Sequence, residues 1–257
     1  MPGDYTVVAH RGYTALGATE NTIRALNHAR AHGATAVEVD LRITKDGQLV
    51  VMHDATLQRT TNCAGWVHKR KLAFITKRCR AGASRLRIPT LDNVLAWAQR
   101  KSSSVILETK ADPLDRWNNR RFRLLANQIV DRGLSDNVMF HSLSDAPLQA
   151  LEAAQPQLYT HAIAGSWRRA LVKLRWADGV TLQAPVATPD HVRRIRELDK
   201  TVLGRESEDP AAWDAYLTAG VDGMLADDVA AVVSFISSWQ PTVEEEEPSA
   251  PSRKVRD

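Results

Sequence analysis

Residues 5–43, YTVVAHRGYTALGATENTIRALNHARAHGATAVEVDLRI, contain one complete strand–helix–strand unit. The run YTVVAH is short and apolar, ENTIRALNHARAHG reads as a helix that stops at Gly33, and TAVEVDLRI is again strand-like. Two strands joined by a helix are typical of a parallel sheet. The first strand nevertheless ends in His10 and Arg11, two side chains that a buried strand does not need for packing.

The same alternation continues through nearly the whole chain. Strand-like runs occupy residues 5–10, 35–43, 103–109, 137–142, 158–163, 179–184, 200–204 and 222–226. Helical patterns occupy residues 20–33, 91–101, 120–133, 146–155, 188–200, 209–220 and 227–239. Thr188 followed by Pro189 is a typical helix start, and Gly133 and Gly220 stand where helices should end. About eight strand–helix units in 257 residues predict an α/β fold, a closed (β/α)8 TIM barrel, because such barrels typically have about 250 residues.

Two segments interrupt this alternation. Asp46-Gly47 separates the apolar-rich runs 36–44 and 48–53, which predicts an antiparallel β-hairpin excursion after strand 2. That hairpin should bring His53 back toward the second strand. Residues 62–88 read as a long irregular loop, and loops of that length are usually functional or mobile.

The chain boundaries follow from composition. Residues 1–239 are predicted to form a single catalytic barrel domain. Residues 240–257, rich in Pro, Ser and charged side chains, are predicted to be a disordered C-terminal tail.

Composition also limits the class of protein. The chain is 44% hydrophobic and 25% charged, which is ordinary for a soluble globular protein, and no run approaches the roughly 18 apolar residues of a membrane span. The N-terminus lacks the pattern of a secretory signal, so we expect a cytoplasmic protein. In that compartment Cys63 and Cys79 are expected to be free thiols rather than a disulfide.

The charge is basic, with a net value of +4 and a pI of about 9.2, which favours some affinity for anions. The basic residues are not interleaved with aromatic ones as on a nucleic-acid-binding surface, so no nucleic-acid partner is expected. The sequence leaves the oligomeric state open.

Three carboxylates point to a metal site. Glu38 and Asp40 are two residues apart and therefore lie on the same face of their strand, and Glu108 ends a neighbouring strand with Lys110 two residues further on. Each alone is compatible with a strand end that has reached solvent. Together, at the carboxyl ends of barrel strands, they predict an oxygen-ligand site for Mg²⁺ or Ca²⁺.

His10 and His53 should approach the same carboxylates from the first strand and from the hairpin. Imidazoles suit general acid and base catalysis near neutral pH. The histidines predicted to be structural or solvated are His28, His32, His68, His161 and His191, with His141 intermediate between the two groups.

These residues resemble a known family. The matching segments are AHRGYTALGATENTIRAL (9–26), AVEVDLRITKDGQLVVMHDATLQRTT (36–61), IPTLDNVLAWA (88–98), VILETK (105–110) and AGVDGMLADD (219–228). They resemble the glycerophosphodiester phosphodiesterase family, within the wider group of phosphatidylinositol-phospholipase-C-like barrels. Their order, HRG, then ExD, then TxDGxxVxxHDxxLxRTT, then LExK, makes the resemblance specific.

The resemblance implies a function and roles for the site residues. It implies metal-dependent hydrolysis of glycerophosphodiesters to glycerol phosphate and an alcohol, through a cyclic phosphate intermediate. His10 and His53 would be the acid–base pair, in which the sequence does not say which residue is the acid. The implied metal ligands are Glu38, Asp40 and Glu108, and the implied phosphate-binding residues are Arg11 and Lys110.

Two departures from the family pattern concern the alcohol. The usual PENT is TENT here, at residues 19–22, and the usual WTVN of the seventh strand is replaced by LGRESED, at residues 203–209. The second change removes an aromatic wall and adds charge at Arg205. The preferred headgroup therefore does not follow from the family.

Two alternative functions remain. One is a lysophospholipase D or sphingomyelinase D-like phosphodiesterase that acts on lysolipids, and the other is a non-catalytic barrel that binds phosphate esters. The first is favoured by a run without any acidic residue between His68 and Ile88, which contains Lys69, Arg70, Lys71, Lys77, Arg78, Arg80, Arg85 and Arg87. This run is either a solvated surface or a positive field at the mouth of the site that attracts anionic substrates or transiently contacts an anionic membrane surface.

Overall fold

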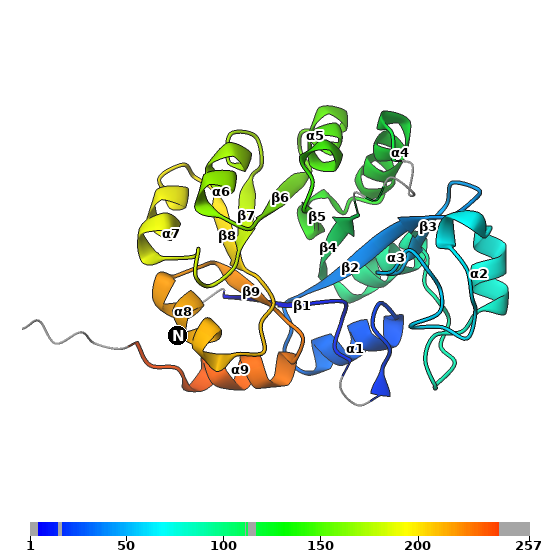
Figure 1. Ribbon diagram of the computed structural model, residues 1–257, viewed down its shortest axis with the longest axis horizontal. Helices are drawn as coiled ribbons and strands as arrows, with labels where there is room; N and C mark the ends of the chain where they lie inside the picture. The colour runs from blue at the N-terminus through cyan, green and yellow to red at the C-terminus, as the bar shows by residue number, and fades with distance from the viewer. Residues whose placement is uncertain (1–4, 15–16, 111, 113–116, 242–257) are drawn as a thin grey trace, which may run out of the picture.

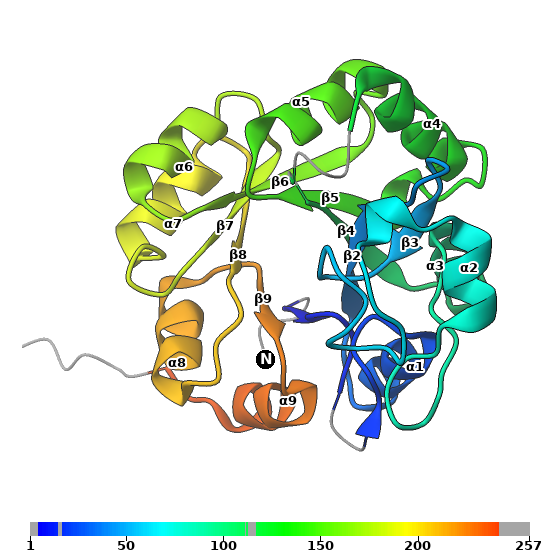
Figure 2. The ribbon, with the colours of Figure 1, turned by 45° about the vertical axis from the view of Figure 1, so that its right-hand side comes forward.

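The computed structural model describes residues 5–14, 17–110, 112 and 117–241. Its parallel strands form a closed barrel surrounded by helices, which confirms the predicted (β/α)8 TIM barrel (Figures 1 and 2). The barrel strands are β1 (Thr6–Ala9), β2 (Ala36–Ile43), β4 (Ser104–Thr109), β5 (Val138–Ser142), β6 (Tyr159–Ala164), β7 (Gly179–Leu182), β8 (Thr201–Gly204) and β9 (Gly223–Ala226). The surrounding helices are α1 (Ile23–Ala31), α3 (Leu91–Lys101), α4 (Asn119–Val130), α5 (Asp145–Ala154), α6 (Trp167–Lys173), α7 (Pro189–Arg196), α8 (Pro210–Ala219) and α9 (Val229–Ser238).

Strand β1 closes the barrel by pairing with both β9 and β2. Val8 is in register with Ala36 of β2 and with Leu225 of β9. Helix α6 is absent from the predicted helices because it has only seven residues, three of them basic, and so shows little helical periodicity.

The alternation of each strand divides its side chains between two environments. Outward residues such as Val37 and Val39 join the large apolar cluster under the helices. Inward residues Val8, Ala36 and Ile106 form a smaller cluster inside the barrel. In this alternation Glu38 and Asp40 share the inward face of β2 with Ala36, so the barrel itself places both carboxylates inside.

The predicted hairpin is present. Strand β3 (Leu49–Val51) pairs antiparallel with β2, with Leu41 opposite Val51, and Gly47 makes the turn with a φ of +76°. A side chain at this φ is strained, which is the reason for glycine in the turn.

Residues 62–88 are not an irregular loop, and that prediction is wrong. They contain a short 3₁₀ helix (Val67–Lys69) and helix α2 (Leu72–Arg78). We call residues 44–90 the excursion; Figure 1 shows it beside the barrel, around α2. It has an apolar cluster of its own, formed by Val50, Met52, Leu57, Val67, Ile75, Cys79, Ala81 and Ile88. The high density of positive charge obscured the short helix in the sequence.

The prediction of free thiols is also wrong, because Cys63 and Cys79 form a disulfide. Helix α2 brings Cys79 back beside Cys63, a proximity that sequence spacing alone does not reveal. The bond links Cys63, which precedes the 3₁₀ helix, to Cys79, the residue that follows α2. Disulfides are rare in the reducing cytosol, so this bond counts against the predicted cytoplasmic location, which stays a prediction.

Among the helices of the described residues, none is long and apolar enough to cross a membrane. The assignment of residues 1–239 to a single catalytic domain stays a prediction. Of the predicted tail 240–257, residues 242–257 lie outside the described residues.

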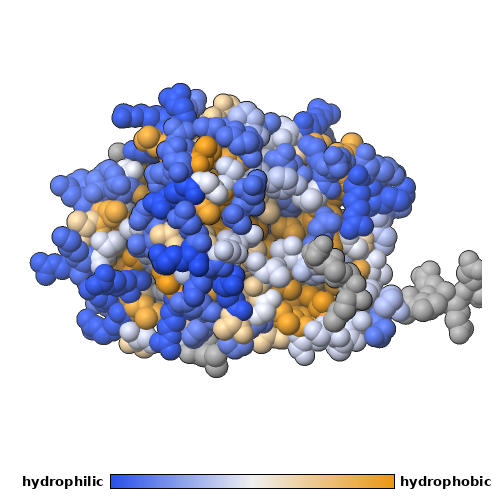
Figure 3. Space-filling view, turned by 180° about the vertical axis from the view of Figure 1, so that it is seen from behind, coloured by the Kyte–Doolittle hydropathy of each residue, from blue (hydrophilic) through white to orange (hydrophobic). Residues whose placement is uncertain are grey.

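Figure 3 shows the molecule from behind the view of Figure 1. Hydrophilic side chains dominate this face, and the apolar residues visible on it form small separate groups.

Candidate active site

Three buried carboxylates converge at the carboxyl ends of β2 and β4. Oxygen atoms of Glu38, Asp40 and Glu108 all lie within 4.8 Å of one another. The strand register explains this arrangement, because Asp40 pairs directly with Glu108 and Glu38 lies two residues earlier on the same face. The structure thus brings together the three residues that the sequence predicted as metal ligands.

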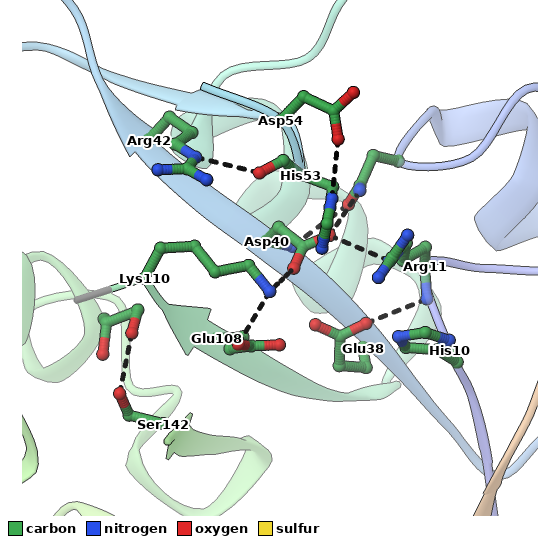
Figure 4. Close-up of polar contacts among 12 residues, drawn as sticks. His10, Arg11, Glu38, Asp40, Arg42, His53, Asp54, Glu108, Lys110 and Ser142 are labelled. Atoms are coloured by element: carbon green, nitrogen blue, oxygen red, sulfur yellow. Dashed lines mark hydrogen bonds and ion pairs between the residues drawn. The ribbon is translucent and has the colours of Figure 1, made fainter. Parts of the chain in front are cut away.

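Lys110 reaches between two of these carboxylates (Figure 4). Its Nζ lies 2.7 Å from Asp40 Oδ1 and 2.7 Å from Glu108 Oε1. Burial alone lowers the pKa of Lys110, but Asp40 and Glu108 outweigh it and raise the pKa above its usual value. Lys110 therefore carries a positive charge inside the site.

Arg11 contributes both its backbone and its side chain. Its backbone N–H donates to Glu38 Oε2 at 2.9 Å, and its Nε lies 3.3 Å from Asp40 Oδ2. Two successive left-handed residues, Arg11 at φ +58° and Gly12 at φ +80°, turn the chain so that this N–H faces inward. A Cβ at Gly12 would come within 2.8 Å of the backbone of Ala25, so only glycine fits there.

Asn21 is a site residue for which sequence reasoning proposed no role. Its side-chain amide donates to Asp40 Oδ2 at 2.7 Å, and its carbonyl oxygen accepts from the backbone N–H of Asp40 at 3.1 Å. Asn21 has a φ of +58°, which asparagine tolerates better than most side chains. Asn21 belongs to the TENT motif of residues 19–22, and its presence in that motif was the only indication of a role in the sequence.

His10 is held by a carboxylate from the far end of the chain. Its Nδ1 lies 2.8 Å from Asp227 Oδ1, at the end of β9, the strand that pairs with β1. Burial lowers the pKa of His10, but the hydrogen bond to Asp227 and the charge of Glu38 outweigh burial and raise the pKa to about 9. With Nδ1 bound to Asp227, Nε2 is the ring nitrogen available for proton transfer.

His53 has the same arrangement on the other side of the carboxylates. Its Nδ1 lies 2.8 Å from Asp54 Oδ1, and Arg42 Nε donates to its backbone carbonyl at 2.9 Å. Arg59 holds Asp54 in place and also binds both oxygens of Glu20 at 2.7 Å. The excursion therefore positions the second histidine through a network that reaches back to the loop after β1.

Two further histidines lie in the barrel interior beside the carboxylates. His141 is in register with Glu108, and both His141 Nε2 and His161 Nδ1 lie 2.9 Å from the hydroxyl of Thr181. Burial lowers the pKa of both imidazoles, that of His161 to about 3, so both are neutral. His161 is a structural histidine, as predicted, and His141 is an uncharged part of the barrel floor.

The carboxylates fit a divalent cation. Burial and the neighbouring Asp40 raise the pKa of Glu38, whereas Lys110 and Arg11 overcome burial and hold the pKa of Asp40 below its usual range. Glu38 Oε1 is buried and accepts no hydrogen bond from the described residues. A cation at this point would offset the one carboxylate that Lys110 leaves unpaired.

Fold and site define a phosphoric diester hydrolase built on a TIM barrel. Residues 10–231 match the model of the glycerophosphoryl diester phosphodiesterase family, and the chain belongs to that family. The chain is 30% identical, over 87% of its own length and 84% of the relative's, to a glycerophosphodiester phosphodiesterase of Bacillus subtilis. It is 29% identical, over 90% of its length and 97% of the relative's, to the enzyme of the same name from Caldanaerobacter subterraneus.

Solved structures share the fold. A glycerophosphodiester phosphodiesterase from Agrobacterium tumefaciens superposes with a TM-score of 0.78 at 24% identity, over 91% of this chain and 99% of that one. A phosphodiesterase from Oleispira antarctica, in complex with the product sn-glycerol-3-phosphate, has a TM-score of 0.77 at 24% identity, over 91% and 97% of the two chains.

Proposed function

We propose that this protein hydrolyses glycerophosphodiesters to glycerol phosphate and an alcohol, with His10 and His53 as the acid–base pair. One observation carries the proposal. Two histidines flank a cluster of three buried carboxylates (Figure 4). Each of the two is bound through Nδ1 to an aspartate. A complex of the Oleispira antarctica phosphodiesterase with sn-glycerol-3-phosphate supports a substrate of this kind.

The proposed cofactor is one divalent cation, Mg²⁺ or Ca²⁺, held by Glu38, Asp40 and Glu108. Bound there, it would offset the charge of the phosphate and lower the pKa of the glycerol 2-hydroxyl. Both ions take carboxylate oxygens as ligands, so the ligand types alone do not discriminate between them.

The residues of the chain would perform the proton transfers. One histidine removes the proton of the 2-hydroxyl as it attacks phosphorus, and the other gives a proton to the departing alcohol. A cyclic phosphate results, and water reopens it with the two histidines in reversed roles. Arg11 and Lys110 bind the phosphate oxygens through charge-assisted hydrogen bonds that strengthen as negative charge develops.

The experiment compares glycerophosphocholine, glycerophosphoethanolamine, lysophosphatidylcholine and a chromogenic phosphodiester by kcat/KM, with Mg²⁺ or Ca²⁺ added after dialysis against EDTA. The deacylated glycerophosphodiesters should be the best substrates. If none of the four substrates is hydrolysed, the proposed enzymatic function is wrong. Full turnover in excess EDTA would contradict the proposed requirement for a divalent cation.

Cation binding has a second, independent measurement. A ligand at a hundredfold excess over its Kd stabilises the folded state by about 2.7 kcal/mol, so Tm should rise by about 5–10 °C in a protein of this size. Glu38→Gln should abolish the rise, while the exposed Glu208→Gln should retain it. A rise of equal size in both variants would place the cation elsewhere.

A lysolipid substrate is the second candidate, and exposed aromatic residues on the excursion favour it. Trp66 is 41% exposed and Phe74 is 37% exposed, on the unit that also holds His53. Such side chains suit the boundary between water and lipid. A preference of tenfold or more for lysophosphatidylcholine would establish this alternative.

We also propose that the excursion contacts anionic membranes transiently. Of its eight basic residues between His68 and Ile88, seven are exposed, and Arg70 lies over the ring of Phe74 at 4.9 Å. Cations beside exposed aromatics match anionic lipid headgroups. Sedimentation with vesicles of phosphatidylglycerol, compared with phosphatidylcholine alone, tests this contact.

A further inference from the structure

A basic cavity lies at the carboxyl end of the barrel, beyond β5, β6 and β8. It has a volume of about 750 Å³. The residues that line it are Leu143, Ser144, Asp145, Ile163, Gly165, Ser166, Arg168, Arg169, Val172, Lys173 and Arg205. None of them belongs to the acid–base pair, the carboxylate cluster or the phosphate-binding residues described above.

The cations of this cavity differ in how they are paired. Lys173 binds Asp145, and Arg205 Nε lies 2.9 Å from Glu206 Oε1. Arg168 and Arg169 are exposed on α6, and no carboxylate of the described residues lies within ion-pair distance of either guanidinium. Two guanidinium groups at one cavity therefore remain available for an anion.

The cavity also has an apolar wall. Leu143 is 57% exposed and Val172 is 49% exposed, and both line it together with the buried Ile163. Exposed aliphatic side chains beside free guanidinium groups suit a ligand with both carbon-rich faces and an anionic group.

The strand ends place the cavity at the same end of the barrel as the three carboxylates. Leu143 follows β5 by one residue, and the register partner of Glu108 on β5 is His141. Arg205 follows β8 directly, so it lies at the same end of the barrel as Leu143. A phosphodiester bound at the carboxylates therefore has this cavity on the side of β5 and β6, away from the excursion.

We infer that this cavity binds the leaving alcohol of the substrate, and that the alcohol it selects is a polyol that carries a second phosphate group. The inference rests on the proposed function. The phosphate would lie between Arg168 and Arg169, where charge-assisted hydrogen bonds to guanidinium groups are strong. The ring carbons of the polyol would lie against Leu143 and Val172. The replacement of the WTVN pattern by a sequence that brings Arg205 to the same cavity agrees with such a ligand.

The test uses two substrates that differ by one phosphate group, glycerophosphoinositol and glycerophosphoinositol 4-phosphate. The unmodified protein should have a kcat/KM at least about tenfold higher for the phosphorylated compound, as expected for one or two charge-assisted hydrogen bonds. The double variant R168Q/R169Q should reduce this ratio to within about twofold of unity. The matched control R123Q/R194Q removes two exposed arginines from α4 and α7 and should keep the ratio.

Equal kcat/KM for the two substrates in the unmodified protein would overturn the inference while leaving the proposed function intact. So would a ratio that survives R168Q/R169Q. If neither compound is hydrolysed, the proposed function fails, and calorimetric titration with free inositol 4-phosphate decides about the cavity. Binding at least about tenfold weaker in R168Q/R169Q than in the control supports the inference, and equal affinity overturns it.

Discussion

Asp227→Asn should move the alkaline limb of the pH–rate profile to lower pH. The charge of Asp227, 2.8 Å from His10 Nδ1, stabilises the protonated imidazole. Together with Glu38 it overcomes burial and raises the pKa of His10 to about 9. A raised pKa keeps His10 protonated through neutral pH, and the proton is lost only as the pH rises through that pKa. Replacing Asp227 with a neutral amide therefore lowers the pKa, and an acid role fails at lower pH.

The magnitude follows from the hydrogen bond. A hydrogen bond to a charged group contributes about 1.5–3 kcal/mol, and 1.36 kcal/mol corresponds to one pKa unit, so the pKa should fall by about one to two units. The side chain of Asp227 is 44% exposed, and water screens its charge, which favours the lower end of that range. A shift of about one pH unit is therefore expected.

The assay is kcat/KM against pH at a saturating concentration of the divalent cation, since this ratio reports the ionisations of the free enzyme. Asp228→Asn is the matched control. Its side chain caps α9 by accepting from the backbone N–H of Ala231 at 3.0 Å, a role that asparagine also performs, and no hydrogen bond joins it to His10 among the described residues. An alkaline limb that coincides in Asp227→Asn, Asp228→Asn and the unmodified protein would refute the reasoning. An NMR titration of the His10 ring would then show whether its pKa has moved at all.

Three further predictions concern the proposed acid–base pair and the excursion. His10→Ala and His53→Ala should each lower turnover at least roughly a hundredfold, as for the loss of a general acid or base, while His32→Ala should be nearly neutral; near-normal turnover in either of the first two would show that histidine to be structural. Reversal of Lys69, Arg70 and Lys71 to Glu should lower kcat/KM for glycerophosphoinositol, leave kcat unchanged and flatten the dependence of kcat/KM on salt, because salt screens the attraction of the basic run for an anionic substrate over about 10 Å at 0.1 M. If the salt dependence is unaltered, the basic run is only a solvated surface. Reduction of the Cys63–Cys79 bond, which spans 16 residues, should destabilise the excursion by about 3 kcal/mol and raise hydrogen exchange there; equal exchange before and after reduction would contradict this.

The barrel could be predicted from the sequence because its determinants are local. The alternation within each strand and the helix between successive strands are visible in short windows, and they already imply a parallel sheet. The spacing of Glu38 and Asp40 also fixes which face they share, and the register of β2 against β4 then brings Glu108 to them. Those three residues were therefore predictable as a cluster.

The residues that hold the histidines could not be predicted in the same way. Asp227 is 217 residues from His10 along the chain, and only closure of the barrel by β1 and β9 brings the two together. Helix α2 and the disulfide escaped prediction for a related reason. A helix of seven residues is too short to show a clear helical period in the sequence. The pairing of two cysteines depends on how the segment between them folds.

His10 and His53 differ in exposure and in their partners, and the sequence motifs do not reveal this difference. Each stands next to a charged residue in the sequence, His10 before an arginine and His53 before an aspartate, and both motifs predict an acid–base residue. In the structure the side chain of His10 is 11% exposed, while that of His53 is 33% exposed and is held by an aspartate that shares its charge with Arg59. Arg59 pairs with Asp54, whereas His10 is the one ion-pair partner of Asp227 among the described residues. The partners that distinguish the two histidines are thus assembled only by the fold.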